Sequence, residues 1–206
     1  MIRPFAALLA LLVLPAAQAE TRRYELDPVH SRVVFFVDHA GFSRAIGTFS
    51  GISGELHFDP ADWRSARVEA SVPIERLQLG DKKWNKRVLD PTFFNVKKYP
   101  QARFVSTAVE SVGDHRLRVS GKLSLRGETQ DVVLDVTFNQ LKRHPLTFRT
   151  TAGFSAQTTL DRFAFGMDNW KKLVGAQVEV RLEVEATRER GKDDEAAEEG
   201  KAEAAP

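Results

Sequence analysis

The residue types that could carry out hydrolysis occur in this chain, but their spacing does not suit it. Asp27, His30 and Ser31 supply a carboxylate, a base and a hydroxyl, yet they lie too close together on one extended segment for their side chains to converge on a reacting atom. The chain also lacks a Gly-x-Ser-x-Gly sequence, which sets the nucleophilic serine of many hydrolases on a sharp turn. These residues do not predict a hydrolase, although His30 or His39 as a general base stays open as an alternative.

Metal and thiol chemistry are poorly supported as well. The chain has no cysteine, which excludes disulfides, catalytic thiolates and cysteine-ligated metals. Its histidines show none of the close spacings that bring two metal ligands to one face of a helix or strand; they are His30, His39, His57, His115 and His144. His30 and His39 are separated by an odd number of residues, so a regular strand points them to opposite faces. We predict no metal and no cofactor.

The elements that must position any site are strands. Apolar and polar residues alternate over many segments, which is typical of strands with one buried and one exposed face; the segments are 52–58, 68–74, 117–125, 132–138 and 176–186. Several candidates, such as 147–160, exceed the usual strand length of about five or six residues. Long antiparallel strands favour a closed barrel of eight to ten strands, and at about eight strands a barrel is wide enough to hold one small ligand.

One segment interrupts the strands. Residues 75–89 have helical spacing, with Asp81 as the expected N-cap, and lead into a stretch bracketed by Pro91 and Pro100. We expect this short helical insertion and its aromatic residues to cover the barrel mouth, although an ordinary loop anchored by aromatics would have the same sequence. The residues predicted to frame the mouth are Leu79, Trp84, Phe93 and Phe94.

A barrel of this kind predicts an apolar ligand site. The candidate wall residues are Phe35, Phe49, Phe58, Phe104, Phe138 and Phe154, which could equally fill a solid interior. Residues 33–37 are all apolar, so alternation does not decide which of them face inward. Basic residues near the mouth could attract an anionic head group or an anionic membrane surface, or could simply form a solvated face; the predicted head-group residues are Lys82, Lys86 and Arg87.

Four segments together resemble the YceI-like family. They are residues 26–39, the aromatic stretch 93–100, the turn region 123–129 and the late motif 160–167, and they occur in the family's order. The resemblance implies an extended eight-stranded antiparallel β-barrel of lipocalin-like architecture in the periplasm, which binds a polyisoprenoid or similar amphiphile in its lumen. Within the late motif, we expect Asp161 and Arg162 to form a buried ion pair. Ala176 departs from the family, which often has an acidic residue there.

The two ends of the chain differ from the body. Residues 1–19 read as a cleaved signal peptide, with Arg3, a ten-residue apolar stretch from Phe5 to Leu14 and Ala17-Gln18-Ala19 as cleavage site. Residues 20–187 are expected to form the single lipid-binding domain. Residues 188–206 are rich in charge and have no large apolar residue, which predicts a disordered tail.

We therefore predict a non-enzymatic, exported protein that carries or sequesters an isoprenoid-type lipid, such as a polyisoprenoid or an isoprenoid quinone. An enzyme that acts on such a lipid is the alternative. The formal net charge of +2 is too small to indicate a nucleic-acid partner. Transient contact with a membrane surface is expected, and pairing of edge strands could give a homodimer.

Overall fold

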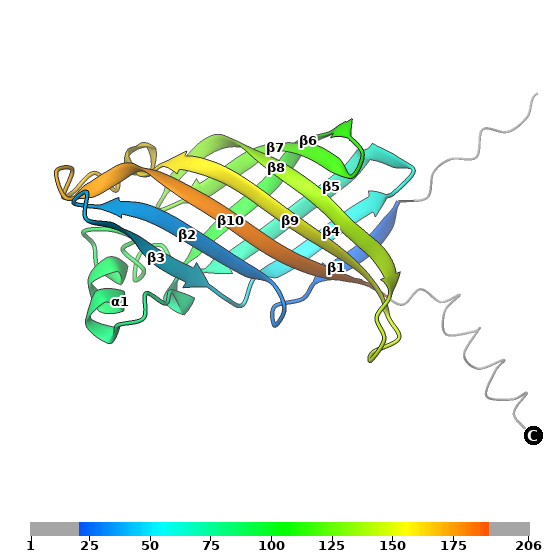
Figure 1. Cartoon of the computed structure of the whole chain (residues 1–206), viewed down its shortest axis with the longest axis horizontal. Helices are drawn as coiled ribbons and strands as arrows, with labels where there is room; N and C mark the ends of the chain where they lie inside the picture. Colours follow the sequence, from blue (N-terminus) through cyan, green and yellow to red (C-terminus); the bar gives the residue numbers. More distant parts are fainter. Residues whose placement is uncertain (1–20, 190–206) are drawn as a thin grey trace, which may run out of the picture.

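The computed structural model describes residues 21–189, which form one antiparallel β-barrel (Figure 1). Its ten strands within this range are β1 (Arg22–Leu26), β2 (Arg32–His39), β3 (Ser43–Phe49), β4 (Ser53–Asp59), β5 (Asp62–Pro73), β6 (Gln101–Gly113), β7 (Arg116–Leu125), β8 (Glu128–Arg143), β9 (Thr150–Asp161) and β10 (Val174–Arg188). Strand β1 pairs with β4, the strands from β4 to β10 pair in chain order, and β10 pairs with β1. These eight strands therefore form a closed ring. The predicted eight-stranded antiparallel barrel is confirmed.

Two shorter strands continue the wall beyond β1 and β4. β1 and β2 both pair with β10, at Ala186–Arg188 and at Val174–Glu183 respectively, so they lie end to end along it. β3 pairs antiparallel with β2, and β4 pairs antiparallel with β1. The outer edge of β3 makes one isolated bridge, between Thr48 and Gln78. The ring of paired strands is therefore complete where β1 and β4 lie. At the other end, within the described residues, the outer edge of β3 pairs with no further strand.

Glycines inside the barrel make room for aromatic rings. Gly47 on β3 lies beneath the ring of Phe35, and Gly121 on β7 lies beneath the ring of Phe104. A Cβ atom at either glycine would overlap the ring, so the ring would have to move toward the lumen. The absence of a side chain at these two positions lets the aromatic rings approach the wall closely.

One end of the barrel is filled by aromatic side chains. Phe58, which is fully buried, stacks on Trp63 with ring centroids 5.2 Å apart, and Trp63 lies 5.0 Å from Phe138. Tyr24 and Phe154 complete this group, at 4.6 Å and 5.9 Å from Phe58. These residues come from β1, β4, β5, β8 and β9 and close that end with protein side chains.

The other end carries the non-strand insertion. A short 3₁₀ helix (η1, Ile74–Arg76) is followed by the α-helix α1 (Lys82–Leu89), which lies at the left of Figure 1. Asp81 caps α1 as predicted, because its carboxylate accepts hydrogen bonds from the amides of Lys83 and Trp84, both at 2.9 Å. The predicted helical stretch is interrupted at 77–80, where Gln78 bridges to β3. Among the described residues, no helix is long and apolar enough to cross a membrane.

The predicted ends of the chain lie largely outside the described residues. This holds for the signal peptide at 1–19 and for the tail from residue 190 onward. The predicted tail boundary at 188 falls inside the barrel, because Arg188 is the last residue of β10 and pairs with Tyr24. Glu189 also forms an ion pair with Arg23, at 2.7 Å.

Candidate functional site

An apolar cavity of about 550 Å³ occupies the barrel and reaches the end that carries α1. Eight of the predicted ligand-binding residues line it: Phe35, Phe49, Leu79, Trp84, Phe93, Phe94, Phe104 and Phe154. Phe154 belongs to the aromatic group at the closed end and forms the floor of the cavity. The volume lies within the usual range of small-molecule pockets, roughly 300–1,000 Å³. The interior is therefore hollow, and its own side chains do not fill it.

Two of the predicted wall residues lie outside the cavity. Phe58 and Phe138 point into the barrel, as their alternation predicts, but they pack behind Phe154 in the closed end. Their role in this structure is to seal that end. Alternation determines the face of a strand to which a side chain points, but not its depth along the barrel axis.

The all-apolar stretch of β2 faces two different environments. Val33, Phe35 and Val37 line the cavity. Phe36 points outward, where the guanidinium groups of Arg44 and Arg181 lie 4.9 and 5.4 Å from its ring centroid. These two cation–π contacts on the outer surface explain why position 36 is aromatic although it does not face the cavity.

The remaining residues of the cavity wall are mostly aliphatic. β7, β8 and β10 contribute branched side chains, among them Val119, Leu123, Leu134, Val136, Val178, Val180, Leu182 and Val184. The alternation of apolar and polar residues in these strands is the sequence signal that identifies them. Trp170 and Leu173 also line the cavity, from an irregular connection whose sequence carries no such signal.

Polar groups are few in the wall, and those nearest the opening include Asp38, His39 and Arg87. The ring of His39 lies edge-on to Trp84, with centroids 5.5 Å apart. Of the predicted head-group residues only Arg87 lines the cavity. Lys82 and Lys86 line a separate surface recess between α1 and residues 90–97.

Arg162 is a buried cation beside the opening, 4% exposed, and it also lines the cavity. Its guanidinium donates to main-chain carbonyls only; these belong to Met167, Asn169 (3.0 Å), Val174 (2.8 Å) and Gly175 (2.8 Å). Burial lowers the pKa of Arg162 from its usual value. The expected ion pair with Asp161 is wrong: the Asp161 carboxylate instead accepts from the Phe163 amide at 2.9 Å and begins the 3₁₀ helix η2 (Arg162–Phe165).

The segment 90–100 closes over the opening, and we call it the lid. Its Phe94 ring packs edge-on against Phe49, with centroids 5.6 Å apart. Arg126, in the β7–β8 turn, holds it by donating to the carbonyls of Phe93 and Pro91, the latter at 3.0 Å. The same guanidinium donates to the carbonyl of Gly166 at 2.7 Å. One side chain therefore ties the lid to two loops at the mouth.

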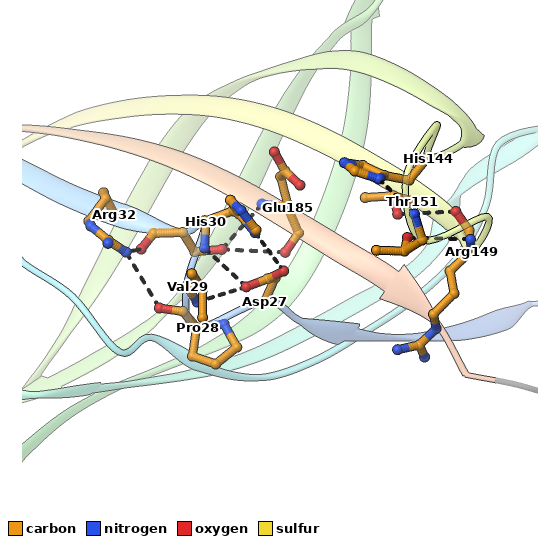
Figure 2. Close-up of polar contacts among 11 residues, drawn as sticks. Asp27, Pro28, Val29, His30, Arg32, His144, Arg149, Thr151 and Glu185 are labelled. Atoms are coloured by element: carbon orange, nitrogen blue, oxygen red, sulfur yellow. Dashed lines mark hydrogen bonds and ion pairs between the residues drawn. The ribbon is translucent and has the colours of Figure 1, made fainter.

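Asp27 and His30 lie on the outer wall, where β1 gives way to β2 (Figure 2), and Ser31 follows them in the same connection. One carboxylate oxygen of Asp27 accepts from the amides of Val29 (2.7 Å) and His30 (3.0 Å), and the other lies 2.8 Å from His30 Nδ1. The Ser31 hydroxyl is buried and bonded to the main chain of Glu185. The three side chains therefore do not form a catalytic relay.

The Asp27–His30 contact changes both protonation equilibria. Burial alone would raise the pKa of Asp27, but hydrogen bonds from His30 and from the two amides outweigh it and lower that pKa. The hydrogen bond to Asp27 raises the pKa of His30. Asp27, His30 and Glu185 have donor atoms within 4.8 Å of one another, close enough for a metal. The Asp27 oxygens are, however, already engaged by the turn they stabilise.

A closed antiparallel barrel with a sealed floor and an apolar interior open at one end defines a class of β-barrel proteins suited to enclose an apolar ligand. The model of the YceI-like domain matches residues 24–186. A UPF0312 protein of Pseudomonas putida strain W619 is 35% identical over 168 residues, which cover 80% of this chain and 87% of that protein. A UPF0312 protein of Azotobacter vinelandii is 31% identical over 194 residues, with 92% of this chain and all of the relative covered. The chain belongs to the YceI-like family.

Solved structures share the fold. BcnA of Burkholderia cenocepacia superposes with a TM-score of 0.70 at 28% identity, covering 78% of this chain and 98% of BcnA. A polyisoprenoid binding domain from Saccharophagus degradans gives a TM-score of 0.60 at 15% identity, covering 81% of this chain and 98% of that domain. At 15% identity the second likeness concerns the fold alone.

Proposed function

We propose that this protein binds an isoprenoid-type lipid inside the barrel and carries or sequesters it without a chemical step. The observation that carries the proposal is the cavity of about 550 Å³, which is lined almost wholly by aliphatic and aromatic side chains and reaches Phe93 and Phe94 of the lid. Each buried CH₂ group contributes about 0.8 kcal/mol, so a branched hydrocarbon of tens of carbons is held without a polar contact. A fold shared with a polyisoprenoid binding domain supports the same ligand class.

The distribution of polar groups indicates how the ligand lies. Phe154 and its aromatic neighbours close the far end, while Asp38, His39 and Arg87 lie where the cavity meets solvent. The hydrocarbon chain therefore points toward Phe154 and the polar end toward α1. Lys82 and Lys86 can act on an anionic head group only from outside the opening, since they line the neighbouring recess. The export signal predicted at residues 1–19 supports a periplasmic location.

A test begins with native mass spectrometry of the protein purified from its own source. We expect an additional mass that extraction with organic solvent removes and that proves to be a hydrocarbon-rich lipid. Ala156 lines the cavity, and its neighbour Gln157 is exposed. Ala156→Phe should abolish the added mass, whereas Gln157→Phe should retain it. Protein that never carries a lipid, or an Ala156→Phe variant that carries it normally, would refute the proposal.

The same measurement addresses the alternative of an enzyme. His39 is the histidine that lines the cavity. A carrier should release its lipid chemically unchanged, and His39→Ala should not change the identity of the bound molecule. A cleaved lipid in the wild type, with intact lipid in His39→Ala, would favour the enzyme.

A further inference from the structure

Large apolar side chains project into solvent around the cavity opening, and they come from three different parts of the chain. Phe42, in the β2–β3 turn, is 92% exposed; Trp84 on α1 is 41% exposed; Trp170 and Leu173, before β10, are 48% and 46% exposed. We call these four residues the apolar rim. Isolated exposed apolar residues are ordinary, but a group of them beside an opening marks a surface that contacts something apolar.

Contacts join the three parts of the rim into one surface. The amide of Ala40 donates to the carbonyl of Leu173 at 2.7 Å, which links the β2–β3 turn to the β9–β10 connection. The guanidinium of Arg87 on α1 lies 5.7 Å from the ring centroid of Trp170. The rim therefore surrounds one opening, and Trp84, Trp170 and Leu173 also line the cavity. These three rim residues therefore belong both to the exposed surface and to the cavity wall.

This end of the barrel is also positively charged. Segments 38–44, 81–100 and 166–173 contain nine lysines and arginines against four aspartates. Three of those aspartates are engaged: Asp38 accepts from the Gly41 amide at 3.2 Å, Asp81 caps α1, and Asp168 forms an ion pair with Lys171 at 3.2 Å. Within residues 21–189, Lys82, Lys83 and Lys172 form no ion pair. By contrast, the turns at the closed end, 59–62, 113–116 and 143–150, contain three basic and three acidic residues.

We propose that the apolar rim and its lysines dock the open end of the barrel onto an anionic phospholipid bilayer, where the lipid of the proposed function enters and leaves. Tryptophan is favoured at the level of lipid head groups, and lysines near an anionic surface each contribute about 1 kcal/mol of attraction. Docking places the cavity opening against the hydrocarbon. The ligand then moves from one apolar phase to another and is not exposed to water, which would cost about 0.8 kcal/mol for each CH₂ group.

The test measures binding of the full barrel to vesicles of phosphatidylcholine, alone or mixed with phosphatidylglycerol. Wild type should bind the mixed vesicles, bind the neutral ones far more weakly, and lose binding as salt rises. Trp84 and Trp170 emission should shift to the blue and be quenched by brominated phospholipid. Phe42→Ser and the pair Lys83→Glu with Lys172→Glu should each weaken binding about tenfold or more. An acidic side chain in the first turn of α1 suits the helix dipole, so Lys83→Glu does not endanger the helix.

Matched variants at the closed end serve as controls. Leu146 is 81% exposed in the β8–β9 turn, so Leu146→Ser removes a comparable apolar side chain. Arg116→Glu with Lys142→Glu makes the same change in net charge at exposed positions there. Both controls should bind vesicles as wild type does. Rim variants that bind vesicles as tightly as the controls would overturn the docking surface. A wild type that does not bind anionic vesicles would also overturn it, and is the result expected if the rim instead recognised an acidic protein.

This inference rests on the proposed function, and the two can fail separately. The rim variants should still carry the lipid in native mass spectrometry but exchange it with vesicles more slowly. A wild type that carries a lipid but never binds vesicles refutes docking alone. A wild type that binds vesicles through the rim but never carries a lipid supports docking and refutes the enclosed ligand.

Discussion

Arg162 is a buried cation that donates hydrogen bonds to main-chain carbonyls of the loop between η2 and β10 and of the first two residues of β10. A guanidinium has five N–H donors in a rigid fork, so one side chain gathers several carbonyls that would otherwise lie unsatisfied in an apolar wall. Removing a partner of a buried polar group costs more than the bond itself contributes, because the group left behind stays desolvated. Arg162, which belongs to the late motif 160–167, thereby holds the main chain beside the cavity opening in place.

Replacement of Arg162 should therefore be costly. We expect Arg162→Met to lower the free energy of unfolding by about 2–4 kcal/mol, since several carbonyls lose their donor at once. Arg162→Lys should recover only part of this, because an ammonium cannot reproduce the planar fork. Urea denaturation measures both variants. A loss below about 1 kcal/mol for Arg162→Met would show that the loop satisfies these carbonyls in another way.

The Asp27–His30 pair predicts a pH dependence of stability. The pKa of His30 is raised, so its contribution is present below the ordinary histidine value of about 6.5 and is lost as pH rises through the raised pKa. The pKa of Asp27 is lowered, so its contribution is present above the ordinary value and is lost as pH falls through the lowered pKa. The pair stabilises the fold most between these two pKa values.

Thermal unfolding of His30→Asn beside wild type checks this dependence. The difference in stability should be largest at mildly acidic pH and should shrink as pH rises past neutrality. Asp27→Asn keeps an oxygen for the two amides and removes the charge, so it should abolish most of the pH-dependent part. A difference that grows with rising pH would contradict the assigned direction of the His30 shift.

The lid is held by several side chains, among them Arg126, Phe94 against Phe49, and Asn169, whose side-chain amide donates to the carbonyl of Thr92 at 3.2 Å. Arg126 bonds the carbonyls of Pro91, Phe93 and Gly166 from a residue with φ of 54° in the β7–β8 turn. Asparagine tolerates this left-handed conformation but cannot reach the lid. Arg126→Asn should therefore leave the turn intact, raise hydrogen exchange in residues 90–100, and speed the release of bound lipid severalfold. Unchanged exchange and release would show that Phe94 and α1 suffice to hold the lid.

The sequence predicts some features of these elements and not others. Alternation and strand length predicted the closed barrel, and the Asp81 cap was correctly placed, because both depend on local patterns. The depth of Phe58 and Phe138 depends on how far each strand is staggered along the axis, which no local pattern encodes. On α1, Arg87 lies three residues from Trp84, on the face toward the cavity, while Lys82 and Lys86 face the recess. Helical spacing could have separated them.

At the scale of the whole molecule, the hollow interior links stability to the ligand. A barrel that encloses about 550 Å³ lacks the dispersion contacts that a solid core would have, and a bound lipid supplies them. A ligand that binds only the folded state stabilises it by mass action, by about 2.7 kcal/mol at one hundred times the dissociation constant. The apo barrel should therefore be distinctly less stable than the loaded one.

Removal of the lipid tests this dependence. Extraction should lower the unfolding temperature, and adding back a long-chain isoprenoid alcohol should restore it in proportion to occupancy. Ala156→Phe fills part of the cavity with a side chain, so this variant should unfold at a temperature that neither extraction nor added alcohol changes. Gln157→Phe, on the outer face, should respond as wild type does. If extracted wild type unfolded at the temperature of the loaded protein, the ligand would not fill the void, and the barrel would be stable through its closed end and its strand pairing alone.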